Sequence, residues 1–260
     1  GWMEQDAGAI WDAVCECTQK VIAGLAEEKR FICGVGVTAL RQSVVPIDNE
    51  GNPLRYAIIW GTKSVETEIK LMQELIGERR LFEITGLSSS PVWAGPFIIN
   101  IINEQNTYRN KLYKILEIED FILYKLGSDV CVSDYSQSGC ISLFDVFNLD
   151  WSKEICDGLN IDMKLLPEVV SPGVSVGKVN AFASEKTGLP ERTQIITGGG
   201  DCQTSALGCG VTQKGSGNIV IGTAAVASIF IDKPLLDEEK ITVCQPHSMP
   251  CKYILDINNQ

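Results

Sequence analysis

The chain has 260 residues, of which 45% are hydrophobic and 21% charged, a composition typical of a globular protein. Its formal net charge of −11 argues against a nucleic-acid partner, because phosphates attract basic surfaces. We find neither the long apolar run of a membrane span nor the basic and apolar blocks of a signal peptide. The ten cysteines form no Cys-x-x-Cys pair, and one histidine cannot complete a usual zinc site. We therefore expect free, mostly buried thiols in a cytoplasmic protein without a protein-bound metal site.

The N-terminal part alternates predicted helices and strands. Apolar residues at helical spacing predict an amphipathic helix over 8–27. The positions that define its buried face are Ile10, Trp11, Val14, Cys17, Val21 and Leu25. A buried strand is expected at 31–37, and 44–47 with 56–60 reads as a hairpin around a polar loop.

The middle of the chain reads as mainly helical. A helix is expected over 66–76, and two or three helices with polar breaks over 97–126. The last of these, at 118–127, resembles a helix of a known family named below, in which Gly127 would be the C-cap. A short helix over 181–186 is closed by Gly188 and Pro190.

A strand, three glycines and a helix follow one another from Gln194 to Ala206. Ile195 and Ile196 suit a buried strand, and the glycines at 198–200 allow a sharp turn and a close approach. Asp201 then stands at or near a helix N-cap, where a carboxylate is favoured. Two interpretations remain open: a simple helix cap, or a catalytic carboxylate at the carboxyl end of a strand.

After this helix the pattern returns to strands. Residues 218–222 and 226–231 read as two strands joined by a turn at Gly222 and Thr223. We predict that this hairpin opens a second domain.

The glycine segment and its surroundings resemble the FGGY family of carbohydrate kinases, which includes xylulokinases, glycerol kinases and autoinducer-2 kinases. The central match is Gly-Gly-Gly-Asp-Cys-Gln at 198–203. Further matches are Gly-Trp-Met-Glu-Gln-Asp at 1–6, Leu-Pro-Glu-Val-Val-Ser-Pro-Gly at 166–173, Thr-Gly-Leu-Pro at 187–190 and Ile-Gly-Thr-Ala at 221–224. Each motif is short, but together they span nearly the whole chain.

The resemblance implies an α/β fold of the ribonuclease H-like type shared with actin and hexokinase. Residues 1–212 would form the N-terminal, sugar-binding domain without its first strands. Residues 213–260 would begin the C-terminal, ATP-binding domain. Family members are much longer and open with a phosphate loop that has no counterpart here, so we expect a fragment that is inactive alone.

The implied activity is ATP- and Mg²⁺-dependent phosphorylation of a hydroxyl on a small sugar or polyol, as in xylulokinases. Asp201 would be the general base. Arg41 and Gln42 would hold substrate, because the matching pair in some members reads Arg-Glu. Gln203 would also contact the sugar, and Gly222 with Thr223 would meet the ATP phosphates.

Each of these residues also has a plainer interpretation. Arg41 could be a solvent-facing residue beside a turn, and Gln203 an ordinary first-turn helix residue. Gly222 and Thr223 could form a plain hairpin turn. His247, in a Pro-His-Ser-Met-Pro segment similar to autoinducer-2 kinases, is expected to be structural. Tryptophans 2, 11, 60 and 93 could stack on a sugar, although packing is the commoner role.

The sequence also departs from the family pattern. Trp-Gly-Thr-Lys-Ser at 60–64 replaces the frequent Trp-x-Asp-x-Arg, and Pro96-Phe97 replaces a Pro-Lys pair. These losses keep open a non-catalytic, sugar-binding or regulatory relative. An oxidoreductase is disfavoured because Gly34-Val35-Gly36 lacks the third glycine of a dinucleotide fingerprint. The identity of the sugar is left open, as is a homodimer.

Overall fold

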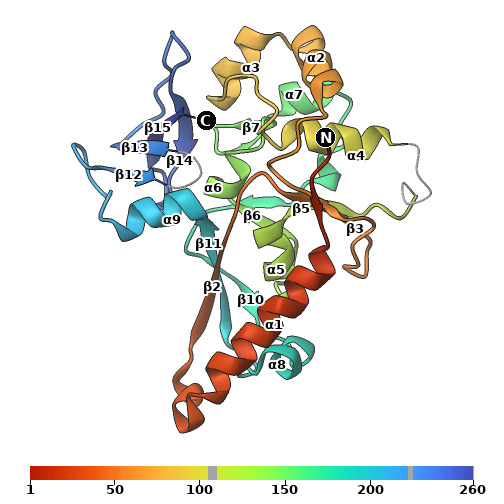
Figure 1. Cartoon of the computed structure of the whole chain (residues 1–260), viewed down its shortest axis with the longest axis vertical. Coiled ribbons are helices and arrows are strands. Elements are labelled where there is room, and N and C mark those ends of the chain that lie inside the picture. Colours follow the sequence, from red (N-terminus) through yellow and green to blue (C-terminus); the bar gives the residue numbers. More distant parts are fainter. Residues whose placement is uncertain (105–109, 222–224, 260) are drawn as a thin grey trace.

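The computed structural model describes residues 1–104, 110–221 and 225–259, in which helices and strands alternate as expected for an α/β protein (Figure 1). The α-helices of this part are α1 (Ala7–Ala23), α2 (Glu66–Leu75), α3 (Glu78–Thr85), α4 (Gly95–Asn103), α5 (Ile118–Leu126), α6 (Tyr135–Ser138), α7 (Lys153–Gly158), α8 (Ala181–Thr187) and α9 (Asp201–Gly208). Short 3₁₀ helices cover Ala26–Phe31 and Met163–Leu165.

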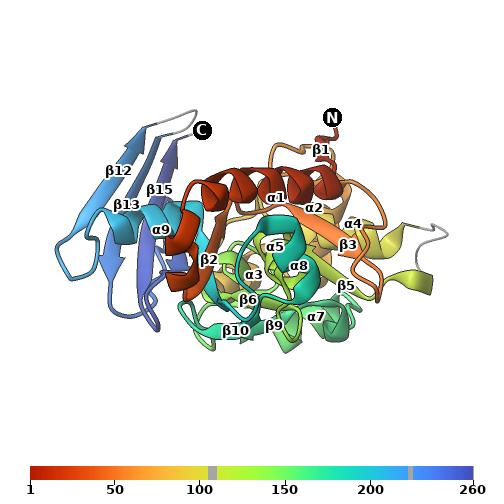
Figure 2. The same ribbon diagram turned by 90° about the horizontal axis from the view of Figure 1, so that it is seen from below.

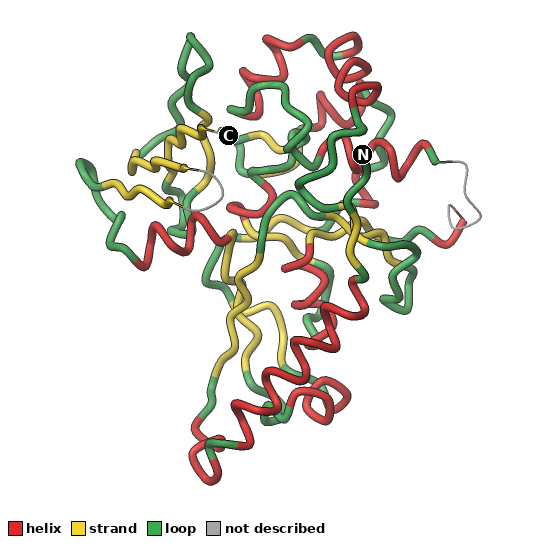
Figure 3. The backbone as a smooth tube through the Cα atoms, viewed as in Figure 1, coloured by secondary structure: helices red, strands yellow, loops and turns green. Residues whose placement is uncertain are grey.

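The strands form several small sheets, visible as yellow segments in Figure 3. They are β1 (Glu4–Gln5), β2 (Gly34–Ala39), β3 (Val44–Ile47), β4 (Ala57–Ile58), β5 (Lys114–Glu117), β6 (Val132–Asp134), β7 (Phe144–Asp145), β8 (Asp150–Trp151), β9 (Glu168–Val170), β10 (Ser175–Lys178), β11 (Gln194–Gly200), β12 (Gly217–Ile221), β13 (Ala225–Ile231), β14 (Val243–Pro246) and β15 (Tyr253–Asn259).

The sheet that positions the site has the order β10-β11-β2. Strand β11 runs parallel to β2, so both strands end at the same edge, where Gly200 pairs with Ala39. The strand predicted at 31–37 is therefore present but displaced toward the C-terminus. Phe31 lies instead in the 3₁₀ helix after α1 and is exposed. Strand β2 is an edge strand whose residues alternate between exposed and half-buried, so the prediction of a buried strand is wrong in that respect.

A second sheet has the order β1-β4-β3-β5 and contains the predicted hairpin of β3 and β4. Strand β5, however, was expected to be helical. It is a strand because Ile115 and Leu116 pair with β3 and are buried beneath it. Helix α5 follows β5 directly and ends, as predicted, at Gly127 in the left-handed region (φ 116°).

Helix α5 lies at the centre of the molecule and contacts β2, β11, β5, β6, α1 and α8. Because it is surrounded, nearly all of its residues are buried, including the acidic residues Glu119 and Asp120 of its first turn. Of these two, Glu119 reaches strand β11, where its Oε1 accepts the backbone N–H of Gly198 at 3.2 Å. The buried acids of α5 are therefore part of the support for the site.

Helix α1 begins after Asp6, whose side chain caps it by accepting from the backbone N–H groups of Gly8 and Ala9. The helix ends four residues before the predicted boundary. Its buried face also differs from the prediction, because Cys17 and Val21 are exposed. The buried residues of the helix are Ala7, Trp11, Cys15 and Ile22.

Helices α2, α3, α4 and α7 gather at the top of Figure 1 and share a hydrophobic core with β3 and the β7–β8 hairpin. The predicted helix over 66–76 is confirmed as α2, and the one over 181–186 as α8. Phe97, where the family pattern has lysine, is fully buried in this core.

The C-terminal sheet, with the order β12-β13-β15-β14, stands to one side of the other elements (Figure 2). The predicted hairpin of β12 and β13 is confirmed, with Ile221 pairing with Ala225. The turn residues Gly222 and Thr223 lie outside the described residues. Strand β14 returns toward α6, and this contact brings the sheet to the site.

All ten cysteines are free, as predicted, but only five are buried: Cys15, Cys131, Cys140, Cys156 and Cys244. No helix among the described residues is both long and apolar enough to cross a membrane.

Candidate functional site

The three glycines that end β11 allow two chain segments to approach each other closely. The register between β11 and β2 shifts at this point. A Cβ atom on Gly198 would lie 1.7 Å from the carbonyl oxygen of Val37, and one on Gly200 would lie 2.4 Å from Cδ of Arg41. Both distances are far inside van der Waals contact, so these positions require glycine.

Asp201 is the first residue of α9, and Gly200 is the N-cap residue. The simple cap interpretation is therefore wrong in detail. The Asp201 carboxylate instead lies among the free N–H groups of the first turn, where Oδ1 accepts from the backbone N–H of Cys202 at 2.8 Å. Its side chain is 57% exposed, so a carboxylate at the end of β11 is open to a ligand.

Arg41 reaches the same place from β2. Because β2 and β11 are parallel, Arg41, two residues beyond β2, meets Asp201 at the shared edge, with Nε 3.8 Å from Oδ1. Arg41 is 8% exposed, so the interpretation as a solvent-facing residue is wrong. Its Nη1 donates to Oε1 of Gln245 at 2.7 Å and to Sγ of Cys140 at 2.8 Å.

The Arg41 guanidinium is a permanent cation in this buried place. Burial acts to lower its pKa, but the thiol and carboxyl groups around it more than compensate, and the pKa is raised. Those groups belong to Cys140, Cys202, Asp256 and Asp201. A fixed positive charge therefore lies beside the Asp201 carboxylate.

Gln203 lies in the first turn of α9 and is fully buried. Its Nε2 donates to Oε1 of Gln245 at 3.1 Å. The same oxygen of Gln245 thus accepts from both Gln203 and Arg41. No sequence pattern marks Gln245, because its role depends on contacts with Arg41 and Gln203, which are far away in the chain.

Gln42 follows Arg41 in the left-handed region, with φ 55°, and is buried. Its backbone N–H donates to Oε1 of Glu117 at 2.9 Å. This carboxyl group holds the turn that carries Arg41 and Gln42. Whether their side chains meet substrate stays a prediction.

Glu117 belongs to an acid cluster, defined here as Glu117, Glu119, Asp120 and Asp134, beneath the glycine strand. Oε1 of Glu119 accepts the backbone N–H of Gly198 at 3.2 Å. Burial raises the pKa of all four carboxyl groups, and their mutual repulsion adds to this for Glu117, Glu119 and Asp120.

The acid cluster also supports the end of β11 through Ser136. The hydroxyl of Ser136 donates to Oδ1 of Asp134 at 2.6 Å and accepts the backbone N–H of Gly200 at 2.9 Å. The cluster therefore fixes both strand ends from which Arg41 and Asp201 project. In the sequence, three members of the cluster stand close together at 117–120 inside an apolar stretch, and this unusual position is the pattern that could have indicated them.

His247 is fully buried, and both ring nitrogens have partners. The backbone N–H of Met249 donates to Nδ1 at 3.1 Å, so Nε2 carries the proton and donates to the carbonyl oxygen of Val211 at 2.8 Å. Burial lowers the pKa of this imidazole. This arrangement agrees with the predicted structural role.

Thr62 in the departing segment at 60–64 and two of the tryptophans have structural roles. Thr62 is buried, and its hydroxyl exchanges two 3.0 Å hydrogen bonds with the backbone of Met3. Trp11 and Trp93 are packed in the core, whereas Trp60 is 44% exposed. Trp2 is also exposed, and it lies against the Arg55 guanidinium.

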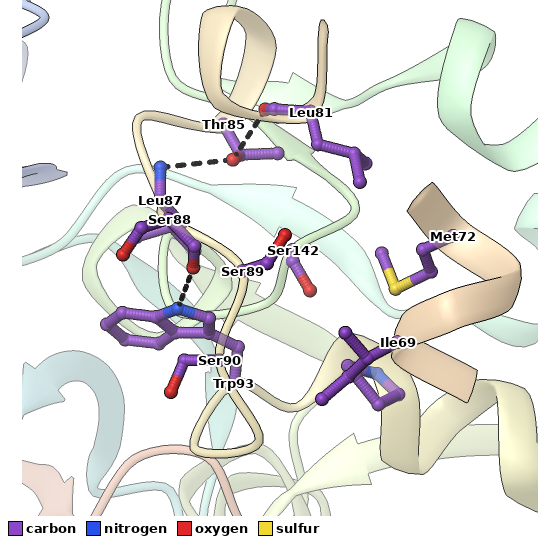
Figure 4. A pocket seen from close by; sticks show the side chains of 11 residues that line it. Ile69, Met72, Leu81, Thr85, Leu87, Ser88, Ser89, Ser90, Trp93 and Ser142 are labelled. Atoms are coloured by element: carbon purple, nitrogen blue, oxygen red, sulfur yellow. Dashed lines mark hydrogen bonds between the residues drawn. The ribbon is translucent and has the colours of Figure 1, made fainter. Parts of the chain in front are cut away.

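Two further features bear on ligands. Within 1–104, 110–221 and 225–259, no group of three or more His, Cys, Asp or Glu side chains is arranged to hold a metal ion. A cavity between α2, α3 and α4 is lined by apolar and hydroxyl side chains, among them Met72, Thr85 and Trp93 (Figure 4). It contains neither Asp201 nor any other carboxylate, so it is not a candidate catalytic centre.

Comparisons with known proteins agree with this arrangement. Residues 1–208 match the FGGY family of carbohydrate kinases, N-terminal domain. An autoinducer-2 kinase of Escherichia coli is 27% identical over 259 residues, which cover 96% of this chain and 47% of that kinase. The chain thus spans about half the length of the relatives it matches.

Solved structures match over the whole described fold. A xylulose kinase from Rhodospirillum rubrum superposes with a TM-score of 0.91 at 19% identity, covering 99% of this chain and 52% of that chain. A Plasmodium falciparum glycerol kinase with ADP superposes with a TM-score of 0.86 at 21% identity, covering 99% and 53%. These likenesses confirm the predicted ribonuclease H-like fold.

Proposed function

Since the chain belongs to the FGGY family of carbohydrate kinases, we propose that Asp201 is the general base in ATP-dependent phosphorylation of a hydroxyl on a small sugar or polyol. The observation that carries this proposal is the placement of Asp201. Its carboxylate is open at the end of β11, next to a buried cation that ends the parallel strand β2. Arg41 places a fixed positive charge 3.8 Å from Oδ1 of this carboxylate.

The reaction needs a base and an aligned acceptor. The hydrogen bond from Cys202 ends on Oδ1 of Asp201, so in this proposal Oδ2 takes the proton of the acceptor hydroxyl. The freed oxygen bonds to the γ-phosphorus of ATP while the bond from that phosphorus to the bridging β–γ oxygen breaks. The products are the sugar phosphate and ADP, and the proton remains on Asp201 until it passes to solvent.

The neighbouring residues orient the acceptor in this scheme. Arg41, Gln42 and Gln203 are the proposed sugar-binding residues, because Arg41 and Gln203 lie next to Gly200 at the Asp201 end of β11 and Gln42 follows Arg41 in the chain. Gly222 and Thr223 are proposed to meet the ATP phosphates from the turn between β12 and β13. Mg²⁺ would be carried mainly by those phosphates, since the described carboxylates form no metal-binding group.

We propose that residues 1–212 hold the sugar and that 213–260 begin the ATP-binding domain. The relatives contain about as much chain again, so we expect this chain alone to bind the acceptor without phosphorylating it. The family members compared here act on autoinducer-2, xylulose and glycerol, and these compounds are the first acceptors to test.

The test is ADP release by the gene product that contains this chain, with autoinducer-2, xylulose and glycerol as acceptors. Turnover of one acceptor that collapses in Asp201→Ala supports the proposal and names the substrate. The matched control is Asp157→Asn, an exposed carboxylate on α7 far along the chain from the site. Sugar binding by calorimetry without turnover of any acceptor would contradict the kinase and favour a non-catalytic relative.

A further inference from the structure

Gln245 joins two residues of the proposed sugar site to a third element. It lies on β14 and is 1% exposed. Its Oε1 accepts from Nη1 of Arg41 at 2.7 Å and from Nε2 of Gln203 at 3.1 Å. Arg41 follows β2, and Gln203 lies on α9, so one oxygen connects three elements that are distant in sequence.

The other side of Gln245 is also engaged. Its Nε2 donates to Sγ of Cys140 at 3.5 Å, and that sulfur also accepts from Nη1 of Arg41 at 2.8 Å. Gln245 therefore has a fixed rotamer, held at both ends of its amide. A side chain held in this way is a rigid acceptor for the two donors.

The adjacent strand contributes charge to the same place. Asp256 on β15 is 1% exposed and pairs with Val243 of β14, whereas Gln245 pairs with Ile254 of β15. Burial raises the pKa of Asp256, and the positive charge of Arg41 opposes this rise without cancelling it. The C-terminal sheet thus supplies both the neutral acceptor and a buried acid to the surroundings of Arg41.

We propose that Gln245 is a positioning residue, which fixes Arg41 and Gln203 against the C-terminal sheet so that both face the acceptor held beside Asp201. The part of this proposal that concerns the acceptor rests on the proposed function. The part that concerns Arg41 does not. A buried guanidinium has many rotamers, and a shared acceptor selects one of them before substrate arrives.

The acceptor oxygen can be separated from the shape of the side chain. Gln245→Met keeps the length and volume but removes the oxygen that the buried donors of Arg41 and Gln203 share. Gln245→Glu restores an oxygen at the same position. Cys244→Ala is the matched control, because Cys244 is buried on the same strand but packs among Val146 and Tyr253 instead of Arg41.

The first measurement is the solvent exchange rate of the Arg41 guanidinium protons, followed by NMR in the 260-residue chain without ligand. Arg41→Lys assigns the signal. We expect exchange at least about tenfold faster in Gln245→Met, with Gln245→Glu and Cys244→Ala within about threefold of the parent. An unchanged rate in Gln245→Met, or an equal rise in Cys244→Ala, would overturn the proposal.

The second measurement is the KM and kcat of the gene product for its best acceptor. Gln245→Met is expected to raise KM about tenfold or more, with a smaller fall in kcat. In Gln245→Glu we expect KM to return most of the way to the parental value. An unchanged KM in Gln245→Met would overturn the acceptor part of the proposal. If the parent protein turns over no acceptor, the proposed function fails, and the exchange rates still decide whether Gln245 positions Arg41.

Discussion

Nε of Arg41 lies 3.8 Å from Oδ1 of Asp201, although one side chain is buried and the other is largely exposed. The pair forms because the parallel strands β2 and β11 end at the same edge. The buried cation is held by β14, and the exposed carboxylate faces outward. The proposed site is built on this pairing of a fixed cation with an exposed carboxylate.

Replacing Arg41 tests that basis. In Arg41→Lys the ammonium group cannot keep the contacts with Gln245, Cys140 and Asp201 together, because it lacks the planar fork of donors. We expect the free energy of unfolding, measured with urea, to fall by about 2–4 kcal/mol.

Arg79→Lys is the control, since Arg79 is 89% exposed and pairs with Glu83 on its own helix. It should change the free energy of unfolding by no more than about 0.5 kcal/mol. Equal effects of the two substitutions would mean that Arg41 is not the buried anchor described here.

Gly198→Ala tests the close approach of β11 and β2. The added methyl group would lie 1.7 Å from the carbonyl oxygen of Val37, and a backbone atom cannot move away alone. We expect a loss of more than about 4 kcal/mol in the free energy of unfolding, or no folded protein.

Gly208→Ala is the matched substitution. Nothing lies within 4 Å of a Cβ atom there, and Gly208 is the last residue of α9. It should be neutral or stabilising by up to about 1 kcal/mol. A folded Gly198→Ala protein with parental stability would show that the two strands are farther apart.

Glu117→Gln tests the protonation of the acid cluster. Burial raises the pKa of Glu117 well above 4.5, so the folded state binds this proton more tightly than the unfolded chain. The stability that this proton contributes is present below pH 4.5 and is lost as the pH rises toward the folded pKa. Glutamine keeps the acceptor for Gln42 and cannot ionise.

In urea unfolding, the free energy of unfolding of Glu117→Gln minus that of the parent should therefore rise by about 1 kcal/mol or more from about pH 5 to about pH 8. For Asp157→Asn, an exposed residue of α7, the difference in free energy of unfolding from the parent should stay constant over this range. A constant difference between Glu117→Gln and the parent would show that Glu117 is ionised in the folded protein throughout.

His247→Gln tests the neutral imidazole. Burial lowers the pKa of His247 below 6.5, so the unfolded chain binds the proton more tightly. The stability that the neutral imidazole contributes is present above pH 6.5 and is lost as the pH falls toward the pKa of His247 in the folded protein. The parent should therefore exceed His247→Gln in stability at about pH 8, by a margin that shrinks by about 0.5–1 kcal/mol at about pH 5. A margin that grows at low pH would instead indicate a charged histidine.

Local sequence patterns predicted much of the secondary structure. The strand, glycine and helix order at 194–206, the hairpins of β3 with β4 and β12 with β13, and the cap at Gly127 each follow from neighbouring residues. Strand β5 could not be predicted in this way. Lys-Ile-Leu-Glu at 114–117 also suits a helix, and pairing with β3 decides its conformation.

The candidate site was predictable only in part. Asp201 and Arg41 stand out because each follows a strand, and the resemblance to a family gives them roles. Gln245 and the acid cluster depend on contacts between segments far apart in the chain, such as that of Glu119 with Gly198. No local pattern contains such contacts, so the support of the site emerged from the structure.

The rate of phosphoryl transfer by Asp201→Asn tests the central claim most directly. It is measured in a single turnover with the best acceptor, alongside the parent and Asp157→Asn. Asparagine keeps the shape and the hydrogen bond from Cys202 but cannot take the proton. We predict a rate about 10²-fold or more below the parent with acceptor affinity nearly unchanged, and no loss in Asp157→Asn. A rate for Asp201→Asn within about threefold of the parent would contradict the role of Asp201 as the base.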